Sequence, residues 1–272
     1  MKILFYIVIF IFGTILGKIS MKAIYCIPKK KNIANEKLKC PKCNHELKPS
    51  DSIPILSYII RRGKCKYCGK KISGLETIVE VLMGIVAIGI FISYNISYSN
   101  ISLIALVEYI CSMIFITTLV VIAGIDKTRK KVAKQVIFFG MMIGIINIIY
   151  LYITKETTLI NIYKLVIYII MICTLSIITN KHKLYKYSYL LEVLMLCIYI
   201  NIFITSEVFL ITAIITMISL LLSITVKKQK NKIDNSDILA ENEVSLDIPI
   251  VFYLCLSTIL AMIIQGVQII LI

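Results

Sequence analysis

Residues 39–72 read KCPKCNHELKPSDSIPILSYIIRRGKCKYCGKKI, a polar segment close to the amino-terminal end of a strongly apolar chain. It holds two cysteine pairs of the form CxxC, with 21 residues (44–64) between them: Cys40 with Cys43, and Cys65 with Cys68. A CxxC pair folds into a tight turn that directs two thiolates at one ion, and four thiolates at this spacing suit tetrahedral Zn²⁺. We therefore predict a structural zinc site with these four cysteines as its ligands.

The predicted metal would stabilise the segment. A domain of about 35 residues cannot bury enough apolar surface to fold unaided, so a bound ion would supply the missing stability. A reducing compartment would disfavour disulfides between these cysteines. His45 could replace one cysteine as a ligand, but we expect it to be exposed because four thiolates already complete the shell. The alternative interpretation is four reduced cysteines without a metal.

The rest of the chain is apolar enough for a membrane. Hydrophobic residues make up 59% of the 272 residues, and the mean hydropathy is +0.90. We predict an all-α polytopic membrane protein with about eight transmembrane helices and a small, zinc-ribbon-like cytoplasmic insertion. The first helix lacks a small-residue cleavage site, so we expect it to be retained rather than removed as a signal peptide. The predicted spans are 3–17, 76–97, 101–125, 135–154, 158–179, 187–204, 206–226 and 249–272.

The distribution of charge predicts the orientation of these spans. Of the 30 Lys and Arg residues, 27 fall in four segments that alternate with weakly basic loops: 18–71, 127–134, 181–186 and 227–232. The positive-inside rule places these four segments in the cytoplasm, and both termini outside. The net charge of +15 could also indicate nucleic-acid binding. Topology signals and lipid-headgroup contacts explain the charge better, so we expect the lipid bilayer and no nucleic acid as a partner.

Three regions follow from these patterns. Residues 1–18 form the first transmembrane helix, and residues 19–75 form the cytoplasmic tetra-cysteine zinc module. Residues 76–272 form a seven-helix membrane domain. Within this domain, residues 227–247 are rich in charged and amide side chains, which is typical of a flexible cytoplasmic linker.

The motifs of the polar segment also resemble a known family. In type IV prepilin peptidases, a tetra-cysteine loop surrounds a stretch of the form D-N-I-P-V-L-S, followed by R-G-x-C-x-x-C. Here Asp51–Ser57 reads DSIPILS, and Arg62–Gly69 reads RGKCKYCG. The eight-span plan is similar too. Further positions match the family less closely: Gly13-Thr14, Lys22, Ile72-Ser73 and Glu80, with Gly17 in place of a family asparagine.

The resemblance implies a membrane aspartic endopeptidase with two catalytic aspartates near the cytoplasmic face. Such an enzyme removes the leader of prepilin-like proteins at the bacterial cytoplasmic (inner) membrane. The family is often bifunctional and also methylates the new amino terminus, which requires S-adenosylmethionine. Asp126 follows an apolar helix and precedes a basic stretch, as the first family aspartate does. At the second position, in the family motif G-x-G-D-x-K, this chain has Leu184 if Lys186 matches the motif lysine.

Glu192 is the replacement that the sequence offers for the missing aspartate. It falls about one and a half turns into the sixth predicted span, where a carboxylate is costly and so indicates a role. Asp126 could instead be an ion-pair partner of the adjacent lysines, and Glu192 a partner for a polar group in the helix bundle. The sequence therefore leaves two functions open: an active peptidase, or a catalytically inactive homologue that binds prepilins or assists pilus or secretion assembly.

Overall fold

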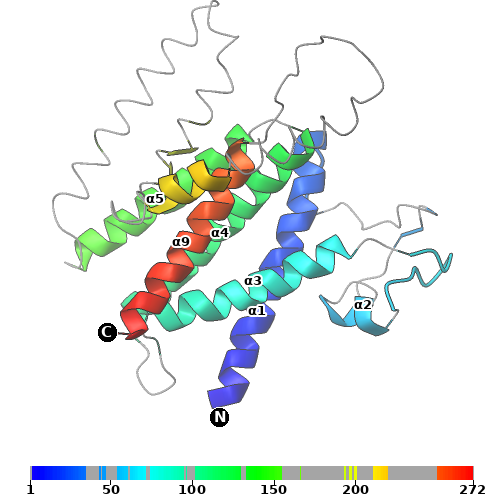
Figure 1. Ribbon diagram of the computed structural model, residues 1–272, viewed down its shortest axis with the longest axis horizontal. Helices are drawn as coiled ribbons and strands as arrows, with labels where there is room; N and C mark the ends of the chain where they lie inside the picture. The colour runs from blue at the N-terminus through cyan, green and yellow to red at the C-terminus, as the bar shows by residue number, and fades with distance from the viewer. Residues whose placement is uncertain are drawn as a thin grey trace, which may run out of the picture.

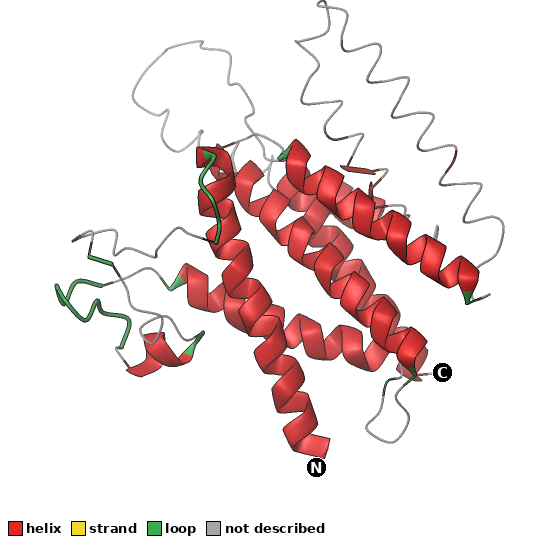
Figure 2. Cartoon of the chain, turned by 180° about the vertical axis from the view of Figure 1, so that it is seen from behind, coloured by secondary structure: helices red, strands yellow, loops and turns green. Residues whose placement is uncertain are grey.

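The computed structural model describes residues 2–34, 43, 45–46, 54–60, 62–71, 74–94, 96, 102–129, 133–154, 166, 193, 196–197, 199–200, 211–219 and 250–271. Its described elements are helices (Figures 1 and 2). They are α1 (Lys2–Cys26), the 3-10 helix η1 (Ile27–Lys29), α2 (Leu56–Ile60), α3 (Leu75–Ser93), α4 (Leu103–Arg129), α5 (Lys134–Ile153) and α9 (Ile250–Leu271).

The described helices agree with the predicted membrane spans. Three segments are long and apolar enough to cross a membrane: Ile3–Lys29, Leu75–Ser93 and Leu103–Arg129. The apolar helices α5 and α9 coincide with the predicted spans 135–154 and 249–272. The chain is thus a helical transmembrane protein. The predicted spans 158–179, 187–204 and 206–226 fall mostly outside the described residues, although 211–219 are helical.

The first helix is longer than the predicted transmembrane segment of residues 1–18. Helix α1 continues to Cys26, through Lys18, Ser20 and Lys22, because no residue in this stretch interrupts a helix. The α-helix gives way to η1 just before Pro28, which has no backbone N–H to donate to a preceding turn. The helix therefore continues beyond the predicted transmembrane segment into the basic segment that follows it.

Helices α1 and α3 cross at a contact between small residues (Figure 1). A Cβ atom placed on Gly13 would lie 2.5 Å from the carbonyl oxygen of Met83 and 2.8 Å from the Cα of Gly84. One turn further along α1, a Cβ on Gly17 would lie 2.9 Å from the Cα of Glu80. Glycines four residues apart let two helix backbones approach closely inside a membrane. This contact fixes α3, and therefore Glu80, against α1.

Replacing Gly13 with valine is expected to break this crossing. The new side chain would meet backbone atoms, which cannot move aside as a flexible side chain can, so we expect a loss of about 2 kcal/mol or more, seen as a melting temperature lower by at least about 4 °C. Gly89→Val on α3 is the matched control, because a Cβ there meets no atom within 4 Å. Thermal unfolding of both variants in nanodiscs tests the prediction. Equal melting temperatures for the two variants would contradict it.

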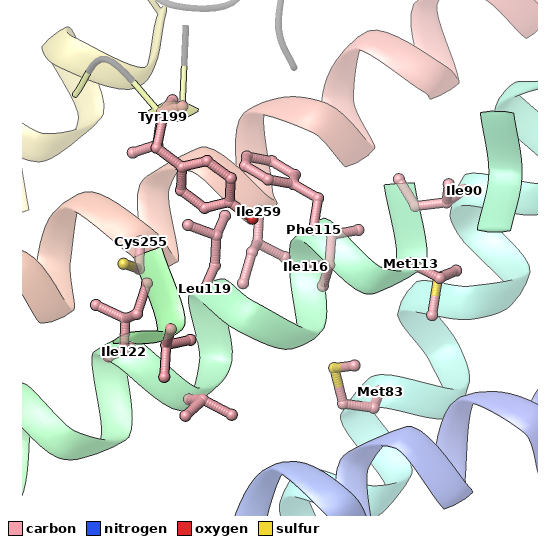
Figure 3. Close-up of a cluster of buried hydrophobic side chains, with 14 of the residues drawn as sticks. Met83, Ile90, Met113, Phe115, Ile116, Leu119, Ile122, Tyr199, Cys255 and Ile259 are labelled. Atoms are coloured by element: carbon pink, nitrogen blue, oxygen red, sulfur yellow. The ribbon is translucent and has the colours of Figure 1, made fainter. Parts of the chain in front are cut away.

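Helix α4 lies at the centre of the described bundle and contacts α1, α3, α5 and α9. Its buried face packs against Tyr199, whose ring centroid lies 5.0 Å from that of Phe115 (Figure 3). The Tyr199 hydroxyl forms a hydrogen bond with Thr118, so this polar group is satisfied inside the core. Because α4 is surrounded by other helices, Asp126 in its last turn is buried in the protein interior. The cluster drawn in Figure 3 includes Met113, Ile116, Leu119, Ile122, Cys255 and Ile259.

Candidate functional site

The second cysteine pair forms a compact knuckle. The N–H of Gly69 donates to the carbonyl oxygen of Cys65, and the N–H of Cys65 donates to the carbonyl oxygen of Lys70, both at 2.9 Å. Gly69 has a φ of +66°, a left-handed conformation that glycine adopts without steric cost. An antiparallel bridge between Lys64 and Lys71 closes the turn. This backbone presents the two thiols of the pair on one side.

Three of the four predicted ligands lie close together. The sulfur atoms of Cys43, Cys65 and Cys68 all lie within 4.8 Å of one another. Sulfurs bound to a tetrahedral zinc at about 2.3 Å lie about 3.8 Å apart, so the described geometry fits a zinc ion with little adjustment. Cys40 lies outside the described residues. Zinc in this site would hold the two cysteine pairs together, which is a structural rather than a catalytic role.

His45 lies beside the cysteine cluster and is not part of it. Its side chain is exposed, as the sequence predicts, and its ring centroid lies 3.6 Å from that of Tyr67 on the second knuckle. This stacking contact joins the segment around the first pair to the second pair. The described cluster is therefore made of thiols, which is the donor type that suits zinc in a structural site.

A buried carboxylate attaches the cysteine module to the membrane helices. Glu80 of α3 is 7% exposed, and its Oε2 accepts a hydrogen bond of 2.8 Å from the backbone N–H of Ile55. Ile55 has a φ of +59°, which is uncommon for a β-branched residue, so the contact holds a strained turn in place. Lys18 of α1 interacts electrostatically with Glu80. The sequence names Glu80 as a family match, but its task as an anchor appears only in three dimensions.

Tyr58 on α2 provides a second attachment. A Cβ on Gly63 would lie 2.8 Å from the Tyr58 hydroxyl oxygen, and a Cβ on Gly74 would lie 3.0 Å from it. Gly74 is the residue that precedes α3. The Tyr58 ring is thus enclosed between the loop after α2 and the start of α3. Together with Glu80, it sets the position of α2 relative to the membrane helices.

Asp126 lies in the last turn of α4 and is fully buried. Its Oδ2 accepts a hydrogen bond of 3.0 Å from the backbone N–H of Phe252, in the first turn of α9. An acidic group is favoured at a helix N-terminus, where free N–H groups and the helix dipole carry positive charge. The exposed Lys127 places its Nζ 4.8 Å from the Phe252 ring centroid. Asp126 is thus a buried acidic side chain that joins two membrane helices.

The partner of Asp126 in the sequence-based hypothesis, Glu192, lies outside the described residues. The sequence did not name Phe252 as part of the site. The sequence does predict a helix that begins here, at the start of the span 249–272, and Pro249 agrees with it because proline is favoured at the beginning of a helix. Nothing local in the sequence indicates that this N-terminus meets Asp126.

The sequence that forms the cysteine module and the first crossing helices is similar to known proteins. Residues 11–94 match the family model described as the Bacterial Peptidase A24 N-terminal domain. A prepilin leader peptidase/N-methyltransferase from Bacillus subtilis (strain 168) is 30% identical to this chain over 132 residues, 48% of this chain and 50% of the relative. The amino-terminal part of the chain is thus similar to the type IV prepilin peptidase family. The family domain thus includes the second cysteine pair, Glu80 and the crossing at Gly13.

Two further members of the prepilin peptidase family carry the same name. The protein of Vibrio cholerae serotype O1 is 38% identical over 95 residues, 32% of this chain and 38% of that protein. The protein of Myxococcus xanthus (strain DK1622) is 28% identical over 142 residues, 52% of this chain and 40% of that protein. The chain therefore spans half or less of the length of these relatives. No solved structure matches the chain significantly.

Proposed function

We propose that this protein is a membrane aspartic endopeptidase that cleaves the leader of type IV prepilin-like proteins at the cytoplasmic membrane face. The observation that carries the proposal is Asp126: it is fully buried at the end of α4, in a chain whose amino-terminal part is similar to the prepilin peptidase family. A buried carboxylate at the end of a membrane helix is costly and indicates a functional site. The relatives named above are prepilin leader peptidases.

Hydrolysis by an aspartic peptidase requires two carboxyl groups in different protonation states. The ionised one takes a proton from a water molecule, while the protonated one donates to the carbonyl oxygen of the scissile peptide. We propose Asp126 as the ionised member, because a backbone N–H at a helix N-terminus favours a negative acceptor. Glu192 is proposed as the second carboxyl. Two such groups in a low-dielectric site readily share one proton.

The orientation belongs to the same proposal. The basic loops place the cysteine module and the 227–247 linker in the cytoplasm, with eight crossings of the bacterial inner membrane and both termini outside. Asp126 would then lie at the cytoplasmic end of its span, where a basic leader followed by an apolar substrate helix can reach it. Zinc bound to Cys40, Cys43, Cys65 and Cys68 would hold the module folded beside this face.

We also propose N-methylation of the newly exposed amino terminus as a second activity. The curated relatives are named N-methyltransferases as well as peptidases. The methyl group would come from S-adenosylmethionine, which supplies an electrophilic methyl to the free amine. The sequence contains no S-adenosylmethionine motif that we recognise, so this activity rests on the family resemblance.

One observation favours a second candidate, an inactive homologue that binds prepilins or assists pilus or secretion assembly. If Lys186 matches the lysine of the second family motif, Leu184 stands in place of the aspartate, and the glycines of that motif are absent as well. Asp126 also has a structural contact, since its Oδ2 accepts from Phe252. An inactive homologue could keep Asp126 for that contact alone.

Cleavage of a prepilin-like substrate in isolated membranes separates these candidates. We expect the wild-type chain to release the leader, with the Bacillus subtilis relative as the positive control. Glu192→Gln is expected to lower the rate at least about 100-fold if Glu192 is the second carboxyl. An inactive wild type, beside an active relative, would support the binding-protein alternative. An active Glu192→Gln variant would remove Glu192 from the site without excluding the peptidase.

A further inference from the structure

Helix α2 carries two large apolar side chains that the protein leaves uncovered. Ile59 is 63% exposed and Ile60 is 72% exposed, whereas Tyr58 on the same helix packs toward Gly63 and Gly74. Adjacent exposed isoleucines are costly in water and indicate a surface that contacts something apolar. We refer to Ile59 and Ile60 as the α2 isoleucine pair.

The contacts of the cysteine module show where the α2 isoleucine pair lies along the length of α3. The hydrogen bond between Ile55 and Glu80 places the beginning of α2 beside the second turn of α3. Figure 1 accordingly shows α2 alongside the start of α3 rather than beyond the end of α1. Glu80 lies about 8 Å along α3 from its beginning, and Tyr58 of α2 packs against Gly74, just before α3. Helix α2 therefore lies beside the first two turns of α3.

At this depth α3 already presents apolar side chains outward. Ile78 is 55% exposed and Leu82 is 54% exposed, and these two residues lie just before and just after Glu80. In a membrane-spanning helix, exposed apolar side chains face lipid. The α2 isoleucine pair therefore lies at a level where the neighbouring helix is expected to meet the outer part of the hydrocarbon region.

The charges around α2 match a lipid surface. Residues 54–71 contain six Lys and Arg residues and no Asp or Glu. Arg62, Lys64, Lys70 and Lys71 are exposed. Basic side chains beside an apolar pair are typical of segments that lie in the membrane interface, with their charges at anionic headgroups and their apolar side chains below them.

We propose that α2 is an interfacial membrane anchor. Ile59 and Ile60 insert into the leaflet beside the start of α3, and the surrounding Lys and Arg side chains contact the phosphates of anionic phospholipids. The cysteine module is then held against the bilayer surface by lipid as well as by Glu80 and Tyr58. This proposal concerns the membrane placement of the module and does not depend on the peptidase activity.

The absence of tryptophan from the chain allows a direct test. The full-length protein carrying Ile60→Trp as its single tryptophan is reconstituted in vesicles of phosphatidylglycerol and phosphatidylcholine. Its fluorescence is quenched either by lipids brominated on the acyl chain or by acrylamide in the water. Leu82→Trp on α3 is the lipid-facing control, and Tyr67→Trp, at a position 41% exposed on the second knuckle, is the water-facing control. Ile59→Trp is a second probe in case Ile60→Trp does not fold.

We expect brominated lipid to quench Ile60→Trp and Ile59→Trp as strongly as Leu82→Trp. Acrylamide should quench the two α2 probes several-fold less than Tyr67→Trp. Strong acrylamide quenching of both α2 probes, with no bromine quenching, would place the pair in water and overturn the proposal. Protection from both quenchers would overturn it too, because the pair would then be covered by protein, such as a substrate helix or a second copy of the chain.

Discussion

Replacing Asp126 with asparagine is expected to lower cleavage of a prepilin-like substrate by at least about 100-fold while the protein stays folded. Asparagine keeps a side-chain oxygen at the position of Oδ2, so it can still accept the hydrogen bond from the Phe252 N–H. It cannot take a proton from water. The substitution therefore removes the proposed chemistry and retains the contact between α4 and α9.

Two further variants distinguish the catalytic role from the structural one. Asp126→Ala removes the acceptor as well, so it should lose cleavage and also about 1 kcal/mol of stability, the typical value of a helix N-terminal cap. Lys127→Gln alters one charge at the next, exposed position and should cleave as the wild type does. Cleavage rates and melting temperatures are measured for all three. A fully active Asp126→Asn variant would mean that Asp126 serves only to hold α9.

The features that sequence predicted well depend on residues close together in the chain. The knuckle follows from the spacing of Cys65 and Cys68 and from Gly69, which takes the left-handed conformation that closes the turn. The spans α3 and α4 follow from runs of apolar residues that must be shielded from water. The position of Asp126 at the end of α4 follows in the same way, because the basic residues after it end the apolar run.

The hydrogen bonds that Asp126 and Glu80 make with distant parts of the chain could not be predicted in this way. Asp126 and Phe252 are 126 residues apart, and Ile55 and Glu80 are 25 residues apart. Such pairs depend on which helices pack together. The pattern of apolar residues within one helix does not identify the helix that packs against it. The sequence leaves open that Asp126 is an ion-pair partner of the adjacent lysines. The structure adds a contact that the sequence did not indicate, because Asp126 is buried and accepts a hydrogen bond from the first turn of α9. Its pairing with Glu192 remains a prediction.

Replacing Cys65 with serine is expected to lower the zinc content of the purified protein from about one ion per chain to near zero, because a neutral hydroxyl is a poor substitute for a thiolate on Zn²⁺. Cys65 is 3% exposed and lies within 4.8 Å of the Cys43 and Cys68 sulfurs, so its loss opens the described cluster. Structural zinc binds with an apparent free energy of about 10–16 kcal/mol in small domains, and most of that free energy supports folding. Metal analysis by mass spectrometry measures the change.

Cys111→Ser is the matched control for this prediction. Cys111 is a half-buried cysteine of α4 outside the described metal cluster, so its replacement should leave the zinc content unchanged. Unchanged zinc in Cys65→Ser would contradict the proposed site. Limited proteolysis with trypsin adds a second readout, because the exposed Lys64 and Lys71 lie on either side of the knuckle and the chain should be cut faster after them once the turn is no longer held. If zinc is lost and trypsin cleavage stays slow, the Ile55–Glu80 hydrogen bond and the Tyr58 packing must hold the module without the metal. In that case the module would keep its fold without zinc, and the role of zinc would be in a contact between the module and another molecule.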